Sequence, residues 1–206
     1  MEDLLCTIQK DYSNFCDKEY VFYLENGTNI NLKFKKENLP HLIGLHKLKS
    51  DYSIVRQMVD KNDYSITPKN IFDIFNEKNI TYNDFAQCAS WTTHIQDRME
   101  NFTYDNVDSI LRKTGMFTFI YNKNKTKNDK AKYVLMDKKD SLFLHLFIGY
   151  DQTLKYYYPN SYVADVKKDS NFISFKTFHI KMSLTKEIFI AFIFDSIKSK
   201  YISIII

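Results

Sequence analysis

Residues 36–49 read Lys36-Glu37-Asn38-Leu39-Pro40-His41-Leu42-Ile43-Gly44-Leu45-His46-Lys47-Leu48-Lys49. This stretch holds two of the chain's five histidines. Its later leucines recur at three-residue spacing, which predicts a short helix that buries one face. Asn38 is placed to cap that helix, and Pro40 falls in its first turn. We expect the functional site to begin here and the rest of the fold to be built around it.

A helix and a hairpin precede this stretch. Apolar residues at helical spacing predict a helix over residues 2–16. Alternating apolar and polar residues then predict two strands, 20–24 and 30–34, joined by the tight turn that Asn26-Gly27 favours. We expect the polar face of the second strand to meet solvent or a ligand. That face carries Asn29, Asn31, Lys33 and Lys35.

The chain after residue 50 divides into helices followed by strands. Apolar spacing and helix-start signals predict helices over 53–60, 68–78, 82–101 and 103–113. Apolar runs and alternation predict strands over 116–121, 131–136, 141–149 and 173–182, with a lysine-rich loop at 122–130 and a turn at 137–140. Residues 187–206 are apolar and fit either a helix or a strand.

This order predicts an α+β fold. We expect an N-terminal helix and β-hairpin, then a helical block, then an antiparallel sheet with four to five strands. We expect a single domain over residues 1–206, with a helical insert at about 53–113 and an apolar tail from about 187. The chain has 206 residues, of which 44% are hydrophobic, and that is enough for one core.

Composition narrows the function classes only slightly. The net charge of +4 is compatible with a nucleic-acid partner, but lysine supplies most of the basic charge. The three cysteines lie far apart and form no CxxC motif, so neither a disulfide scaffold nor a zinc site is indicated. We expect a cytoplasmic protein without a membrane segment, because no secretory signal is apparent and the longest apolar run is too short to cross a bilayer.

Motifs for several reaction classes are missing from the sequence. It contains no Walker A, GxGxxG, HExxH or GxSxG motif, and no acidic cluster of the kind that two-metal nucleases use. Histidine, lysine, arginine, serine and tyrosine near a sheet remain. That set suits cleavage of RNA without a metal or other cofactor, in which a base takes the 2′-hydroxyl proton and cations stabilise the phosphorane.

Histidines within predicted helices have two interpretations. His41, placed in the first turn, would stay neutral beside the positive helix end and could act as a base next to a phosphate. His41 and His46 also fit ordinary, partly exposed histidines, which spacing alone favours. His94 and Arg98 are four residues apart and fit a phosphate contact, although a solvated face is the more common outcome of such spacing.

A resemblance to a known family adds to these patterns. Phe34 followed by residues 38–45, Asn-Leu-Pro-His-Leu-Ile-Gly-Leu, resembles the F-x-x-x-N-F-x-H-L-x-G-L signature of the fourth group of phage Barnase–EndoU–colicin–RelE-like (BECR) nuclease domains. Residues 131–135, the strand over 142–147 and Tyr-Pro-Asn-Ser-Tyr at 158–162 are similar to later blocks of that group. The likeness spans most of residues 19–184. Leu39 stands where the group often has an aromatic residue.

The resemblance implies an RNase fold in which helices lead into a four-stranded sheet. It implies catalytic roles for His41 and Ser161 and, by looser matches, for Lys132 and Tyr133. We further expect substrate contacts from His46, Arg56, His145 and Tyr158. Each residue has an ordinary alternative: Ser161 as a turn residue, Lys132 as a solvated lysine, the tyrosines as core and edge aromatics, His145 as a packed histidine, and Arg56 as a structural arginine.

The resulting hypothesis is a metal-independent endoribonuclease of phage or mobile-element type, a toxin or effector. We expect RNA as its substrate and an antitoxin or immunity protein as a possible partner. An alternative is a catalytically inactive module that binds RNA or protein. Another alternative is an accessory protein that uses residues 53–113 as its interaction surface.

Overall fold

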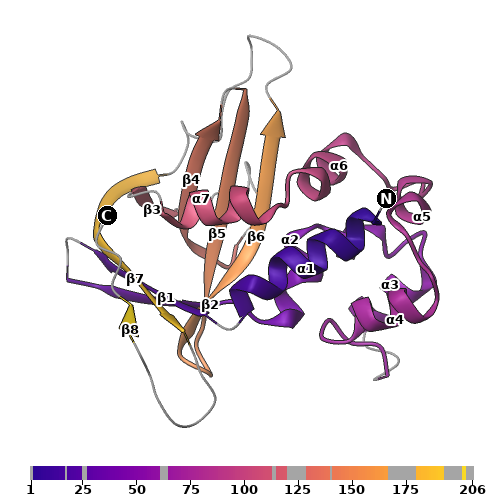
Figure 1. The fold of residues 1–206 in the computed structure, drawn as a ribbon, viewed down its shortest axis with the longest axis horizontal. Helices are drawn as coiled ribbons and strands as arrows, with labels where there is room; N and C mark the ends of the chain where they lie inside the picture. Colours follow the sequence, from indigo (N-terminus) through magenta and orange to yellow (C-terminus); the bar gives the residue numbers. More distant parts are fainter. Residues whose placement is uncertain are drawn as a thin grey trace.

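The protein combines a curled mixed sheet with helices gathered along it (Figure 1). The structure is a computed structural model, and it describes residues 2–16, 18–24, 27–60, 65–112, 115–119, 129–139, 141–166, 180–192 and 201–202. The predicted α+β class is confirmed. In the described residues no helix is both long and apolar enough to cross a membrane.

The N-terminal helix and hairpin form as predicted. Helix α1 (Leu4–Cys16) buries a stripe at helical spacing: Leu5, Ile8, Tyr12 and Phe15. Strands β1 (Lys18–Leu24) and β2 (Asn29–Lys33) pair antiparallel, with Phe22 opposite Ile30. Alternation sets which face is buried, because successive side chains of a strand point to opposite sides. Gly27 takes a φ of +81° after β1.

The stretch at 36–49 is three short pieces, so the prediction of one helix is wrong. They are the 3₁₀ turn η1 (Lys36–Asn38), helix α2 (Leu39–Leu42) and the 3₁₀ turn η2 (Leu45–Leu48). Gly44 separates α2 from η2 with a φ of +83°, a conformation that stops a helix. Asn38 occupies the N-cap position of α2, as predicted, but its side chain makes no capping hydrogen bond there. Its Oδ1 instead accepts a hydrogen bond from the Lys35 backbone N–H at 3.0 Å.

The helical block consists of α3 (Ser53–Asp60), α4 (Ile71–Glu77), α5 (Tyr82–Ala86), α6 (Thr93–Glu100) and α7 (Tyr104–Arg112). The first and last predicted helices of the block are confirmed. The predicted helix over 82–101 is wrong, because it is two helices. Thr92 caps α6 by accepting from the Ile95 N–H at 3.4 Å. The Asp51 carboxylate accepts a hydrogen bond from the Ser90 N–H at 2.6 Å and so fixes the turn between α5 and α6.

The sheet has the strand order β1-β2-β6-β5-β4-β3-β7-β8, and pairing of β1 with β7 closes it on itself. The later strands are β3 (Gly115–Phe119), β4 (Ala131–Lys139), β5 (Leu142–Asp151), β6 (Tyr156–Val166), β7 (Ile180–Phe192) and β8 (Tyr201–Ile202). The sheet is larger than expected because the hairpin joins it. It is mixed because β2 runs parallel to β6.

Four smaller predictions have different outcomes. The turn expected at 137–140 begins later, since residues 137–139 still belong to β4. The apolar tail contributes strand, because residues 187–192 lie in β7. Residues 173–179 of the strand predicted over 173–182 lie outside the described residues, as do residues 122–128 of the predicted loop.

The core lies between the helices and one face of the sheet, and α7 packs on β4 and β5 (Figure 1). Leu144, Leu146 and Ile148 of β5 face this core, whereas Phe147 joins a smaller cluster on the other face, as their alternation predicts. The core draws residues from α1, the hairpin, the helical block and the sheet. The division into one domain with an insert stays a prediction.

Candidate functional site

A tight turn at Gly44 brings two histidines face to face. His41 lies in α2 and His46 in η2, and the left-handed Gly44 reverses the chain between them. Their ring centroids are 4.2 Å apart and the rings are within 19° of parallel. We use the name histidine cluster for His41, His46, His94, Arg98 and Asp165.

Arg98 lies beneath this turn. Its side chain comes from α6 and is only 4% exposed. Its Nη1 donates to the Leu42 carbonyl at 3.4 Å, and its Nη2 lies 3.2 Å from His94 Nε2. A Cβ built on Gly44 would lie 3.5 Å from Cδ and Nη1 of Arg98. The solvated face expected for His94 and Arg98 is therefore wrong for Arg98, which supports the turn from inside.

Asp165 gives the cluster a carboxylate. It lies on β6, and its Oδ1 is 3.9 Å from His94 Nδ1. Burial raises the pKa of Asp165 to about 6, against the opposing effect of the nearby Arg98 charge. Helices α2 and α6 both pack against β6, which explains how residues far apart in sequence meet here.

The histidines of the cluster are neutral at neutral pH. Desolvation, together with the charges of Arg98, Lys130 and Lys47, lowers the pKa of His41 to about 4. Desolvation and neighbouring His41 and Arg98 lower the pKa of His46 to about 3. His41 keeps an exposed surface while His46 is half-buried. A proton acceptor is therefore available on the solvent side of the pair.

The expected source of this neutrality was wrong. The sequence placed His41 in the first turn of a helix, beside its positive end. His41 does lie in the first turn, but α2 is only four residues long, so this one turn is also its last. The low pKa therefore comes from desolvation and neighbouring cations rather than from a helix dipole.

Three polar atoms of the cluster are buried without a hydrogen-bond partner among the described residues. They are His46 Nδ1, Arg98 Nε and Asp165 Oδ2. Each unpaired buried polar atom costs about 1–3 kcal/mol, so folded proteins contain few of them. Their concentration in one cluster indicates that its composition is not chosen for stability alone.

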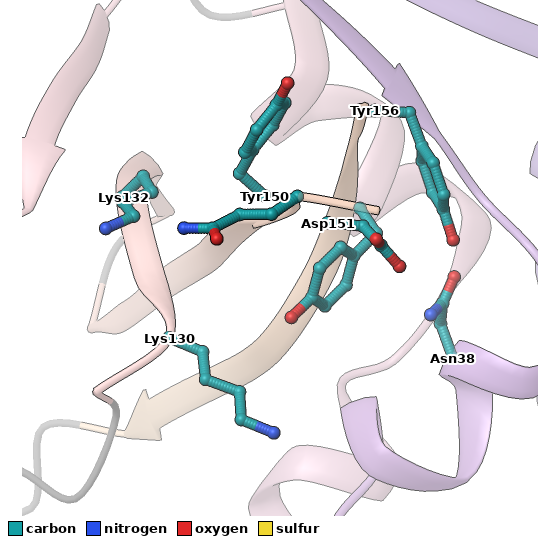
Figure 2. Close-up of a pocket in the computed structure, with 8 residues that line it drawn as sticks. Asn38, Lys130, Lys132, Tyr150, Asp151 and Tyr156 are labelled. Atoms are coloured by element: carbon teal, nitrogen blue, oxygen red, sulfur yellow. The ribbon is translucent and has the colours of Figure 1, made fainter. Parts of the chain in front are cut away.

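Lysine, tyrosine and asparagine side chains surround an open hollow (Figure 2). We call it the tyrosine–lysine hollow, and its volume is about 440 Å³. It is lined by Asn38, Lys130, Lys132, Tyr150, Asp151, Gln152, Tyr156 and Tyr158. Figure 2 shows Lys130 and Lys132 on one side of the hollow, and Asn38 and Tyr156 on the opposite side.

Two features determine the charge and shape of the hollow. Oδ1 of Asp151 accepts from the backbone N–H groups of Thr153 and Leu154, both at 2.9 Å, so this carboxylate holds the β5–β6 turn. The ring of Tyr158 lies directly against Gly149, where a Cβ would come within 2.7 Å of it. The hollow therefore offers two lysines and several tyrosine rings to a ligand.

Lys130 connects the hollow with the histidine cluster. It lines the hollow, and its charge helps to lower the pKa of His41. Asn38 also lines the hollow and stands three residues before His41 in the chain. A phosphate held at the hollow would thus be close to a neutral imidazole. Within the described part of the chain, no group of three or more His, Cys, Asp or Glu side chains could hold a metal ion.

The predicted site residues are only partly brought together. His41 and His46 stack, and Lys132 and Tyr158 line the same hollow. Tyr133 lies elsewhere, with its ring 5.8 Å from that of Tyr157. The roles assigned to these residues stay predictions.

The other three predicted site residues do not line the tyrosine–lysine hollow. Ser161 stands opposite Phe147 in the β5–β6 register. Arg56 donates to the carbonyls of Lys49 and Ser50, at 3.1 and 2.9 Å, and so closes the end of η2. His145 is 1% exposed, which leaves no surface for a substrate in this conformation. Their predicted roles stay predictions.

Sequence reasoning missed several residues that the structure brings to the site. Lys130 belonged to a predicted loop, and Asn38 was read as a helix cap. Tyr150 and Asp165 carried no signal, because single residues in strands are not distinguished by spacing. Arg98 was singled out only by its spacing from His94.

Comparison with known proteins is informative at the level of the family. No curated protein and no solved structure matches the chain. Residues 4–203 match the sequence profile of the family described as phage-Barnase-EndoU-ColicinE5/D-RelE like nuclease4. The match spans nearly the whole chain and agrees with the α+β architecture. The protein belongs to this fourth group of phage BECR-like nucleases.

Proposed function

We propose that the protein is an endoribonuclease of phage or mobile-element type that cleaves RNA without a metal ion. One observation carries the proposal. A neutral, solvent-accessible His41 lies beside a hollow that presents Lys130, Lys132 and several tyrosines. Such an arrangement combines a proton acceptor with cations that attract phosphate.

The chemistry follows from these groups. His41 takes the proton of a ribose 2′-hydroxyl, whose oxygen attacks the adjacent phosphorus. The bond from phosphorus to the 5′-oxygen then breaks, and that oxygen takes a proton from solvent. The products are a 2′,3′-cyclic phosphate and a 5′-hydroxyl. Lys130 and Lys132 stabilise the negative charge that builds up on the phosphorane.

Substrate binding prepares His41 for this role. Desolvation and, to a smaller extent, nearby cations lower its pKa to about 4, which makes the free imidazole a weak base. A bound phosphate brings negative charge next to the same cations and raises the pKa of His41 toward its ordinary value. A general base works best when its pKa is near the working pH. The substrate thus increases the basicity of the residue that deprotonates its 2′-hydroxyl.

One histidine variant and two lysine variants test the proposal. We expect His41→Ala to lower the rate of RNA cleavage by about 10²- to 10⁴-fold, measured on tRNA, rRNA and mRNA in EDTA. Lys132→Ala should weaken cleavage, whereas Lys69→Ala, which changes an exposed lysine in the helical block, should not. Circular dichroism would check that each variant is folded.

Other outcomes separate the competing functions. Intact RNA after incubation with the wild-type protein would contradict the proposal. Binding with a steep salt dependence but without cleavage would identify the inactive binding module instead. A toxin or effector role predicts that expression slows growth, that His41→Ala relieves this effect, and that an antitoxin or immunity protein protects the host.

A further inference from the structure

We propose that the outer face of the β1–β2 hairpin is a second binding subsite, which takes a base of single-stranded RNA next to the cleaved nucleotide. This inference rests on the proposed function. We call the subsite the hairpin groove. Its volume is about 430 Å³, within the usual range for small-ligand sites. It is lined by Val21, Tyr23, Asn29, Asn31, Tyr150, Lys155 and Tyr157.

The hairpin places polar and aromatic side chains side by side on its outer face. In the β1–β2 register Tyr23 stands opposite Asn29, and Val21 stands opposite Asn31. Tyr23 is 38% exposed, which is unusual for a large apolar ring in this chain. Exposed aromatic rings beside amide groups suit a nucleobase, because the ring stacks on its face and the amide binds its edge.

Two more tyrosines form a stacking platform at the other side of the groove. Tyr150 and Tyr157 are opposite each other on β5 and β6, with ring centroids 4.7 Å apart. Tyr157 also shares a side-chain hydrogen bond with Tyr133. This bond holds the Tyr157 ring in place, so little rotamer freedom is lost when a base stacks on it. Tyr133 would act as a positioning residue rather than as a catalytic one.

The groove is continuous with the tyrosine–lysine hollow. Tyr150 lines both, so the two meet at its ring. Tyr156 and Tyr158 alternate with Tyr157 along β6 and therefore point to the opposite face of that strand. An RNA that occupies both sites must bend around Tyr150. A single strand can follow such a path, whereas the stiff, wide A-form duplex cannot.

Charge on this face favours a nucleic acid. Among the described residues that line the groove none is acidic, and Lys155 is placed to meet a phosphate. Glu19 lies further along the same hairpin face, but its carboxylate pairs with Lys33 at 3.4 Å. Asparagine amides offer both donors and acceptors, which suits the edges of bases.

Binding of uncleavable oligonucleotides tests the proposal separately from catalysis. Fully 2′-O-methylated RNA lacks the attacking hydroxyl, so its affinity can be measured with the wild-type protein. We expect a strand of about eight nucleotides, a length that a site of this kind accommodates, to bind about 10-fold more tightly than a dinucleotide, and more tightly than the matching duplex. Tyr23→Ala should remove most of this gain, while leaving the affinity for the dinucleotide unchanged.

Three further variants sharpen the test. Tyr23→Phe keeps the ring and should keep the affinity. Asn31→Asp places a negative charge in the groove and should weaken binding of the long strand. Leu154→Ala changes a side chain that is 61% exposed at the β5–β6 turn and lines neither site, so it should have no effect.

The outcomes separate this inference from the proposed function. Equal affinity of Tyr23→Ala, Asn31→Asp and the wild type for the long strand would overturn the hairpin groove, even if His41→Ala abolishes cleavage. Loss of the length dependence in Tyr23→Ala would support the groove, even if the wild type proves unable to cleave.

Discussion

The histidine cluster and the tyrosine–lysine hollow are neighbours built in opposite ways. The cluster places Arg98 almost out of reach of solvent and half-buries Asp165, so burial decides which groups carry a charge. The hollow exposes Lys130 and Lys132 at the surface. Lys130 belongs to the hollow but also acts on His41 in the cluster.

This difference shows how a base and a phosphate site can be kept close without cancelling each other. A cluster that exposed all of its histidines would titrate near neutral pH and compete with the lysines for counterions. Burial instead keeps the imidazoles neutral, while exposure keeps the lysines available to a ligand. The following variants test whether the histidine cluster depends on burial and whether the tyrosine–lysine hollow depends on exposure.

Removal of the buried guanidinium should have the largest effect. Arg98→Leu takes a donor from the Leu42 carbonyl and leaves Asp165 without its nearby cation. We expect the free energy of unfolding to fall by roughly 3 kcal/mol, because a buried charge is left unpaired. Urea denaturation measures this loss.

Arg112 provides the matched control for Arg98. It is an arginine of the next helix, and its side chain is 36% exposed in a 2.6 Å ion pair with Asp108. Arg112→Leu should cost less than about 1 kcal/mol, as exposed ion pairs do. Equal losses for the two arginines would show that burial of the cluster has no special energetic role.

Acid should destabilise the protein through the cluster. The folded-state pKa values of His41, His46 and His94, about 4, 3 and 4, lie below the ordinary 6.5. The unfolded chain therefore binds more protons in this window, and their contribution is lost as the pH falls from about 6.5 toward 4. Asp165, with its pKa raised to about 6, acts in the opposite direction.

We expect the histidines to prevail, with a net loss of roughly 2 kcal/mol between pH 7 and pH 4, after allowance for the solvent exposure of His41 and His94. Urea denaturation across this range measures the loss. Asp165→Asn removes the opposing contribution and should make the fall in stability steeper. A stability that rises on acidification would contradict the protonation states assigned to the cluster.

A substitution at Gly149 should change the shape of the hollow by moving the Tyr158 ring that lines it. A Cβ at this position would lie 2.7 Å from Cζ and 2.8 Å from the hydroxyl oxygen of Tyr158, so the tyrosine ring must move. We expect Gly149→Ala to cost about 1.5 kcal/mol by overpacking and to weaken RNA binding. A double-mutant cycle with Tyr158→Ala measures the coupling, and additive effects would mean that the ring is not displaced by the methyl group.

The smallest effect expected concerns the turn between the histidines. Gly44 and Gly27 have nearly the same φ, +83° and +81°. Substitution of either by alanine should cost about 1 kcal/mol, because the added Cβ disfavours the left-handed conformation. Only Gly44→Ala should also lower RNA cleavage, since it disturbs the stacking of His41 on His46. Similar cleavage rates for both variants would show that the turn at Gly44 does not affect activity.

Much of the fold could be predicted because its signals are local. The hairpin and the two faces of β5 follow from alternation, and α1 follows from helical spacing. Prediction failed where one residue outweighed a periodic pattern. Gly44 interrupts the leucine spacing of residues 36–49, and Thr92 starts a new helix within an apparently continuous one.

The candidate site was harder to predict. His41 could be selected from a motif. Neither spacing nor charge predicted that Lys132 and Tyr158 would line the same hollow. Ser161 and His145 share the sheet with them but lie at other positions of it. A motif identifies residues that a family has in common, whereas contacts between strands and helices decide which of those residues meet.

The sequence by itself determined the α+β order, the buried faces and the membership in a nuclease family, because these depend on periodicity and on short motifs. Only the tertiary structure decided the state of the site. It brought Arg98 of α6 under the Gly44 turn, Asp165 of β6 beside His94, and the charge of Lys130 within electrostatic range of His41. Desolvation and the distances between charges set protonation states, and both depend on neighbours that are remote in the chain.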